Sequence, residues 1–143
     1  MIENIAYNEL CLAIIIRANY KEDGIRFFTP GEFSQQLGYM KRPKGYVIEP
    51  HIHKHVERKV FYTQEVLLIK SGVVRVDFYD KLQNYLESRT LQKGDVILLA
   101  SGGHGFEILQ DAEIIEVKQG PYISENDKIR FTTVKTGMLT ESL

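Results

Sequence analysis

The sequence predicts an all-β fold, either a barrel or a sandwich of two sheets, on three observations. Short apolar segments rich in Val, Ile, Tyr and Phe recur along the chain, and turn signals interrupt them about every 8–12 residues, as is typical of such folds. Helical periodicity is nearly absent. The predicted strands are also too many for one open sheet in a chain of 143 residues, so we expect the sheet to fold or close on itself.

The first two predicted strands cover residues 10–18 and 25–28. Between them lies Lys21-Glu22-Asp23-Gly24, whose Asp-Gly step favours a hairpin turn. Residues 29–32 combine a capping hydroxyl, a proline and a glutamate, which predicts at most a short helical turn. Further strands are predicted at residues 37–40, 45–53, 60–70, 73–79, 85–91, 96–99, 104–109, 112–118 and 129–134.

Two kinds of strand pattern indicate how the sheet is covered. In segment 73–79 apolar residues alternate with others, so Val74, Val76 and Phe78 share one face. We expect that face to contact the core and the face carrying Arg75 to contact water. Segments 66–69 and 96–99 are apolar throughout, which is typical of strands covered on both faces.

Composition and charge exclude several classes of protein. The chain is 43% hydrophobic and 26% charged with a formal net charge of −1, so it is expected to be globular and offers no broad attraction to nucleic acid or anionic lipid. The longest apolar stretch, residues 10–16, is far shorter than the ~20 residues that span a bilayer. We therefore expect one domain over residues 1–143, with no nucleic acid or membrane partner.

Location and assembly are also predicted. The single cysteine, Cys11, cannot form an internal disulfide, and residues 1–10 lack the basic and apolar regions of a secretory signal. These features favour the cytoplasm. The apolar segment 10–16 either forms part of an interface between copies of the chain or belongs to the core.

Two histidines in segment 45–53 carry the first chemical signal. His51 and His53 stand two apart, and side chains so spaced on a strand share a face with Cα atoms about 6.6 Å apart. Their imidazoles can converge on one ion at metal–nitrogen distances of ~2.1 Å. A lone His-x-His is weak evidence, so the surrounding residues decide its meaning.

The frame around this pair resembles the first motif of the cupin superfamily. That motif consists of a glycine, five residues, His-x-His, and then a glutamate followed after six residues by a glycine. It appears here as Gly45, His51, His53, Glu65 and Gly72. The gap between His53 and Glu65 is eleven residues, longer than is usual in the superfamily. Glu57 has the shorter spacing but lacks the following glycine, so Glu65 is favoured and Glu57 stays open as the alternative carboxylate.

The second cupin motif, a glycine, a turn and one further histidine, is similar to the stretch from Gly94 to His104. Ala100 stands where the superfamily usually has proline, and Ile108 where it has asparagine. Segment 102–103 is a pair of glycines that permits a tight turn and leaves room beside His104. The region that carries both motifs is 45–109.

The resemblance implies a cupin-type double-stranded β-helix, that is, a jelly-roll barrel. It further implies one divalent transition metal held by His51, His53, Glu65 and His104. The resemblance also implies a homodimer. Nitrogen and oxygen donors without thiolate suit Fe, Mn, Zn, Ni or Co, and ligand type alone does not choose among them.

Three functions follow from the resemblance, and the sequence leaves them open. The first is a metal-dependent enzyme of the isomerase/epimerase, lyase or dioxygenase type that acts on a small polar or anionic metabolite. Basic clusters at 41–44 and 54–59 favour an anionic substrate if they overhang the barrel mouth. The second is a metal-independent enzyme, similar to nucleotide-sugar isomerases and epimerases, that uses histidine as acid and base. The third is a non-enzymatic module that binds or senses a small ligand.

Overall fold

The computed structural model describes residues 1–124, 127–133 and 141–142. These residues contain no α-helix, and no helix in this part of the chain is long and apolar enough to cross a membrane. The prediction of an all-β fold is confirmed. The strands are β1 (Ile2–Tyr7), β2 (Leu10–Ile16), β3 (Gly24–Phe27), β4 (Gly38–Lys41), β5 (Glu65–Tyr79), β6 (Tyr85–Gln92), β7 (Val96–Leu99), β8 (Gly103–Lys118) and β9 (Glu141–Ser142).

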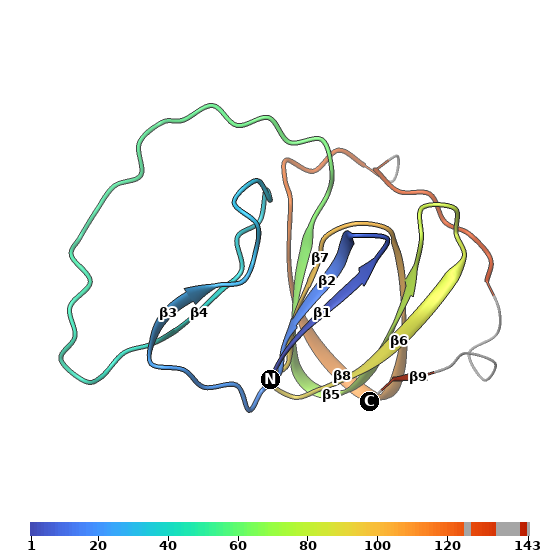
Figure 1. Cartoon of the computed structure of the whole chain (residues 1–143), viewed down its shortest axis with the longest axis horizontal. Helices are drawn as coiled ribbons and strands as arrows, with labels where there is room; N and C mark the ends of the chain where they lie inside the picture. Colours follow the sequence, from blue (N-terminus) through green and yellow to red (C-terminus); the bar gives the residue numbers. More distant parts are fainter. Residues whose placement is uncertain (125–126, 134–140, 143) are drawn as a thin grey trace.

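Seven strands form one curled sheet, in the order β1-β2-β7-β5-β6-β9, with β8 paired to β5. On one edge of β5 lie β7 and then β6, whereas β8 runs antiparallel along the whole opposite edge. The sheet curls into an open half-barrel, seen at the right of Figure 1. The two remaining strands, β3 and β4, form a separate antiparallel sheet beside it (Figure 1).

A sharp bend in β5 produces the curl. Leu99 pairs with Glu65, and only four residues later Gly103 pairs with Tyr79. Four residues of chain reach at most about 14 Å, whereas a straight strand as long as β5 would extend roughly 50 Å. The two ends of β5 must therefore lie close together. The bend occurs around Gly72, whose φ is +84°, at three successive register shifts between β5 and β8.

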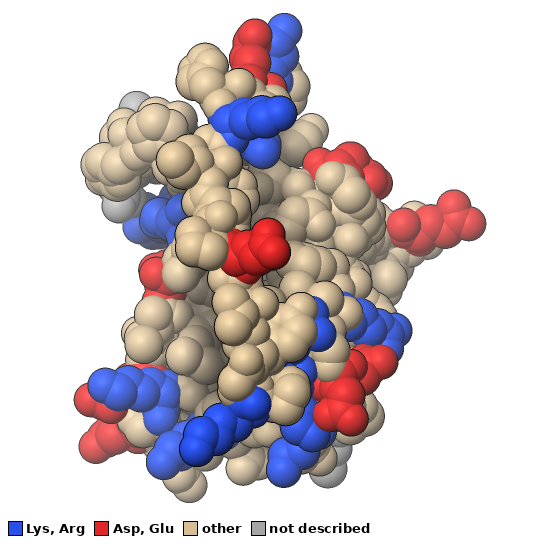
Figure 2. Space-filling model, turned by 90° about the vertical axis from the view of Figure 1, so that its left-hand side faces the viewer, with Lys and Arg blue, Asp and Glu red and all other residues tan. Residues whose placement is uncertain are grey.

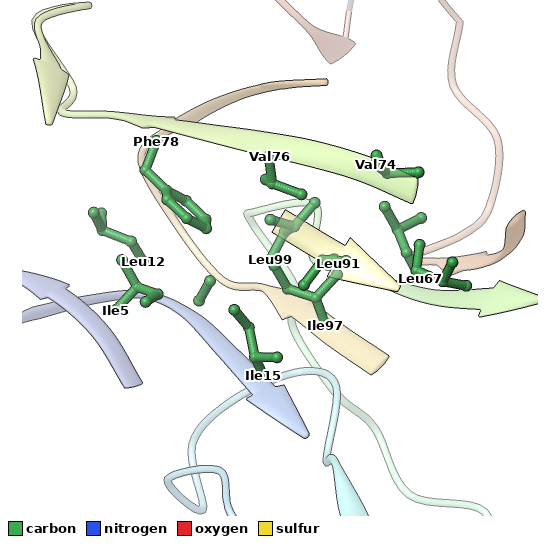
Figure 3. Packing of buried hydrophobic residues seen from close by; sticks show 12 residues of the cluster. Ile5, Leu12, Ile15, Leu67, Val74, Val76, Phe78, Leu91, Ile97 and Leu99 are labelled. Carbon is green, nitrogen blue, oxygen red and sulfur yellow. The ribbon is translucent and has the colours of Figure 1, made fainter. Parts of the chain in front are cut away.

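The main core fills the concave side of the half-barrel (Figure 3). Val74, Val76 and Phe78 are at most 1% exposed there, which confirms the predicted core face of segment 73–79. The same core takes residues from β1, β2, β6 and β7: Ile5, Leu12, Ala13, Ile15, Leu91, Ile97 and Leu99. Side chains of β2 and β7 are thus buried inside the half-barrel, so segment 10–16 belongs to the core.

A second core lies on the convex side. There Ile14, Ile16 and Leu98 pack against residues 20–37, including Phe28 and Leu37. Segment 96–99 is thus covered on both faces, as predicted, whereas Leu68 of segment 66–69 is 36% exposed, so the prediction for that segment is wrong. The expectation that Arg75 faces water is wrong, since Arg75 is 6% exposed and its guanidinium donates to Asp77 Oδ1 at 2.8 Å.

The first hairpin differs from the predicted one. β2 pairs with β1 and β7, and β3 pairs with β4, so the strands at 10–18 and 25–28 do not pair. β1 was not predicted. It joins β2 through Asn8 and Glu9, whose positive φ values of 49° and 63° are those of a two-residue hairpin turn.

The predicted helical turn at residues 29–32 is a hydrogen-bonded turn. The amide of Phe33 donates to the Pro30 carbonyl at 3.1 Å. The Thr29 hydroxyl accepts from the amide of Leu37 at 3.2 Å and does not serve as a helix cap. After this turn the chain continues through residues 34–37 into β4 without forming a helix.

Four predicted strands merge into two observed ones. Segments 60–70 and 73–79 form the single strand β5, which begins at Glu65, and segments 104–109 and 112–118 form the single strand β8. Segment 45–53 is not a strand, and neither are residues 129–133. Residue 134 lies outside the described part of the chain.

Candidate functional site

Glu65 and His104 meet at the mouth of the half-barrel. The Oε2 atom of Glu65 lies 3.5 Å from Nε2 of His104, and the two side chains are 14% and 30% exposed. Glu65 has the same strand parity as the core residues Leu67 and Ile69, and His104 pairs with the core residue Phe78. Both side chains therefore point to the concave side. Glu65 lies at the start of β5 and His104 at the start of β8, and the bend in β5 brings these two strand ends together.

The connection between β7 and β8 holds His104 in place. The amide of Ala100 donates to the Leu12 carbonyl at 2.8 Å, and Ser101 Oγ donates to the Cys11 carbonyl. A Cβ atom on Gly102, whose φ is +73°, would lie 2.6 Å from the carbonyl oxygen of Tyr79. The chain can thus turn from β7 into β8 only with a glycine at this position.

The environment keeps Glu65 ionised. A hydrogen bond from His104 lowers the pKa of this carboxyl group, burial opposes it by raising the pKa, and the charges of His104, Lys118 and Lys128 lower it further, so that the net pKa lies below the ordinary value. An ionised carboxylate beside an imidazole is a typical metal ligand pair, and it is equally a pair suited to proton transfer.

His51 and His53 lie elsewhere, in a long segment without strand structure that we call the arm, residues 42–64. Both side chains are exposed, and their rings stand edge to face with centroids 5.3 Å apart. Nδ1 of His51 lies 2.8 Å from the Glu49 carbonyl oxygen. Because a carbonyl only accepts, Nδ1 is the donor in this contact, and a neutral ring held in this way offers the lone pair of Nε2 to a ligand.

Of the four predicted ligands, His51 lies beside His53 and Glu65 lies beside His104. The two pairs lie apart from each other. Among the residues that it describes, no group of three or more His, Cys, Asp or Glu side chains is placed to hold a metal ion. As arranged in one chain, these residues do not form a metal centre, and the convergence of all four stays a prediction. Glu57, the alternative carboxylate, is exposed in the arm, whereas Glu65 contacts His104.

The arm enters β5 through an anchored residue, Gln64, which is 7% exposed. Its Oε1 accepts from the amide of Gln35 at 3.0 Å, and its carbonyl accepts from the amide of Gln119 at 3.0 Å. The preceding residue, Thr63, donates to both carboxylate oxygens of Asp127, at 2.8 and 2.9 Å. These bonds fasten the end of the arm to the segment that follows β8.

That segment, which we call the strap (residues 119–124 and 127–131), crosses from one end of β8 to the other. Phe131 packs edge to face on Tyr79, with ring centroids 5.0 Å apart, and its ring would lie 3.1 Å from a Cβ atom on Gly103. The strap therefore begins beside Gln64, at the start of β5, and reaches Tyr79 and Gly103, at the end of β5 and the start of β8.

An open cavity of about 880 Å³ lies between the arm, the strap and residues 31–36. Four basic side chains and two acidic ones line it, together with aromatic rings that include Phe33, Tyr62 and Tyr122. The basic residues are Arg58, Lys59, Lys118 and Lys128. Lys118 also pairs with Glu65 across the sheet, so this cavity adjoins the candidate site.

Basic and acidic side chains are interspersed on the face of the molecule shown in Figure 2. The basic cluster at 41–44 is engaged locally, because Lys41 Nζ lies 2.9 Å from Asp23 Oδ1 and the Arg42 guanidinium stacks 4.4 Å from the Tyr46 ring centroid. Of the two predicted basic clusters, only the one at 54–59 contributes to the cavity, through Arg58 and Lys59.

Sequence reasoning missed Gln64, Lys118 and Lys128. Their position beside Glu65 depends on the pairing of β5 with the last residues of β8 and on the path of the strap. No local pattern contains that information, although the parity of Lys118 relative to a known register would have placed it on the concave face.

Comparison of the chain with models of protein families, with curated proteins and with solved structures finds no match. The class of protein that the fold defines is an all-β protein with a curled, antiparallel half-barrel sheet. Within that class, the contact between Glu65 and His104 defines the candidate site.

Proposed function

We propose that this protein is a cupin-type, metal-dependent enzyme that acts on a small polar or anionic metabolite, by isomerase/epimerase, lyase or dioxygenase chemistry. The proposed ligands of one divalent transition metal are His51, His53, Glu65 and His104. The observation that carries the proposal is the 3.5 Å contact between Glu65 and His104. It joins the carboxylate of the first motif to the histidine of the second on the concave side of a curled sheet.

The backbone at the motif glycines supports the cupin assignment. Gly45, Gly72 and Gly94 have φ values of +89°, +84° and +89°, which side chains other than glycine rarely adopt. All three motif glycines thus lie where the chain requires glycine. Together with the doubling back of β5 and β8, this supports a jelly-roll barrel as the completed fold.

The chemistry of the donor set supports a metal. The Nε2 lone pair of His51 is free, since its Nδ1–H is held by Glu49, and a hydrogen bond from the second ring nitrogen to a carbonyl is common among metal-bound histidines. Three imidazoles and one carboxylate suit Fe, Mn, Zn, Ni or Co. For these donors to meet, the arm must move relative to the arrangement in one chain.

The proposed substrate class follows from the cavity beside Glu65. Its four basic side chains outnumber its two acidic ones, and Asp127 is already bonded to Thr63. A carboxylate or phosphate group is therefore the best match for Lys118 and Lys128. The tyrosines that line the same cavity add apolar surface with a polar end. We also propose a cytoplasmic location, because a single cysteine cannot form the internal disulfides that are common in secreted proteins.

Elemental analysis of the protein purified from cells supplied with metals tests this function. We expect one transition metal per chain in the wild type and at least a tenfold loss in the double variant His51→Ala/His53→Ala, which should stay folded because both side chains are exposed. A matched control is His55→Ala, a third exposed histidine of the arm, which should keep the metal. A folded wild type without stoichiometric metal contradicts the proposal.

The Glu65–His104 contact also favours a second candidate, metal-independent acid–base catalysis. Here Nε2–H of His104 donates to the carboxylate of Glu65, which orients the ring and leaves Nδ1 to exchange a proton with a substrate. Turnover that persists in excess chelator and is abolished in His104→Ala, but not in His51→Ala/His53→Ala, would favour this candidate. Turnover lost in chelator and restored by added metal would favour the first.

A further inference from the structure

β8 carries one edge that no strand covers in the described part of the chain. Over its whole length it pairs with β5 alone, so the backbone groups of its opposite edge are available to another strand. Exposed apolar side chains, each 36–54% exposed, accompany that edge on both faces: Phe106, Ile108, Leu109, Ile114, Ile115 and Val117. A long, apolar edge of this kind is a site for strand addition.

The arm is a strand-length segment that lacks a partner for most of its length. Within the part of the chain that the structure describes, the hydrogen bonds, ion pairs and ring contacts of residues 43–59 join only residues within 42–53. Its large apolar side chains are exposed, with Val47 at 73% and Ile52 at 93%. Figure 1 shows the arm passing outside β3 and β4 before it returns to β5. One chain thus contains both an open edge and an unpaired apolar segment.

Both ends of the arm are fastened to the convex side of the sheet. The strand before the arm, β4, follows Leu37, which is buried in the convex core. At its other end, Gln64 bonds to Gln35 and Gln119. Glu65 and His104 point to the concave side, so the arm would have to pass round the rim of its own sheet to reach them. The open edge of β8 faces away from β5 and is therefore accessible to the arm of a second copy.

We infer that two copies of this chain exchange their arms, so that the arm of the partner subunit adds to the open edge of β8. This inference rests on the proposed function for its metal readout. A strand around residues 45–53 has His51 and His53 on the same face as each other. Addition to the His104 end of β8, in the register that gives both residues the parity of His104, places that face on the concave side. His51 and His53 of the partner subunit then join Glu65 and His104, which gives two shared sites related by a two-fold axis.

A complementation experiment tests the exchange. The variant His51→Ala/His53→Ala lacks the arm ligands, and the variant Glu65→Gln/His104→Ala lacks the sheet ligands, so neither should retain metal by itself. When the two are co-expressed with different tags and the mixed dimer is isolated, exchange predicts one complete site, hence half of the wild-type metal per dimer. If each arm serves its own chain, the mixed dimer holds no complete site, and the absence of metal overturns the inference.

The mass of the protein in chelator tests the exchange without any metal. We expect a wild-type dimer by sedimentation and a monomer for Ile108→Lys, because a charge on the open edge opposes strand addition. Ile108 is 51% exposed, so the chain should still fold. The control Leu82→Lys, at a side chain 82% exposed in the turn after β5, should stay dimeric. A monomeric wild type, or a dimer unchanged in Ile108→Lys, overturns the exchange; a metal-free wild type that behaves as predicted contradicts only the proposed function.

Discussion

The backbones of Gly72 and Asp111 pass so close to each other that a Cβ atom at Gly72 would lie 2.1 Å from the Asp111 carbonyl oxygen. This contact is where β8 follows β5 round its bend. The bend brings Glu65 and His104 together, so the geometry of the candidate site depends on a glycine at position 72.

The substitution Gly72→Ala should therefore destabilise the fold severely. We expect a loss of about 3–5 kcal/mol, from the strain of a positive φ and from overlap with the backbone of residues 111–112. The control Gly45→Ala has a similar φ of +89° but nothing within 4 Å of the added Cβ, so it should lose only ~1 kcal/mol. Denaturant unfolding measures the free energy of unfolding of both variants. Equal decreases in the two variants would show that the close approach of Gly72 to Asp111 does not restrict the residue at position 72.

Asp95 holds the turn between β6 and β7 to the end of β2. It is 4% exposed and accepts from the amides of Ala18 and Gln92 at 2.8 and 2.7 Å and from Arg17 Nη1 at 3.1 Å. Asp95→Ala leaves the two amides without this acceptor and removes one partner of Arg17, which keeps its bonds to Glu3 and the Thr90 carbonyl. The substitution should cost about 3–5 kcal/mol. Asp23→Ala, at an exposed ion pair with Lys41, should leave the unfolding midpoint close to that of the wild type, because solvent screens exposed ion pairs. Urea unfolding of the two variants gives the comparison, and similar midpoints would contradict the role of Asp95.

Glu3 makes the stability depend on pH. Burial raises the pKa of its carboxyl group, but hydrogen bonds and charges from Arg17 and Arg89 outweigh burial, so the pKa lies below the ordinary 4.5. A lowered folded-state pKa stabilises the fold above the unfolded value, and this stability is lost as the pH falls through the folded value.

Glu3→Gln should accordingly be less stable than the wild type by about 1–3 kcal/mol at pH 7, and the difference should shrink as the pH falls below 4.5. Glu9→Gln, at an exposed position of the β1–β2 turn, should retain the wild-type profile. Thermal unfolding measured across this pH range checks both. A difference between Glu3→Gln and the wild type that persists undiminished at low pH would contradict the ion-pair account.

The sequence predicted the all-β class and the strands whose boundaries depend on local pattern. Segment 96–99 matches β7, and segment 85–91 lies within β6, because apolar residues bounded by turn residues define them. β1 was missed because Glu3 and Asn4 interrupt its apolar pattern. Those residues are explained by tertiary contacts, since Glu3 pairs with Arg17 and Arg89.

Long-range pairing accounts for the other differences. Ser71 and Gly72 indicated a break between two strands, whereas β8 follows β5 through the bend and keeps it a single strand. Arg75 was expected to face water because it alternates with the apolar core residues, but Asp77 and Glu107 pair with it and permit its burial. The contact of Glu65 with His104 follows from the same bend, which local spacing does not encode.

The ligand set of the proposed metal is the central claim, and X-ray absorption at the metal edge of the native protein tests it most directly. The account predicts three imidazole nitrogens and one carboxylate oxygen at about 2.0–2.2 Å, with one imidazole missing in His104→Ala and the carboxylate missing in Glu65→Gln. A spectrum without imidazole scattering, or one that neither substitution changes, would contradict the account.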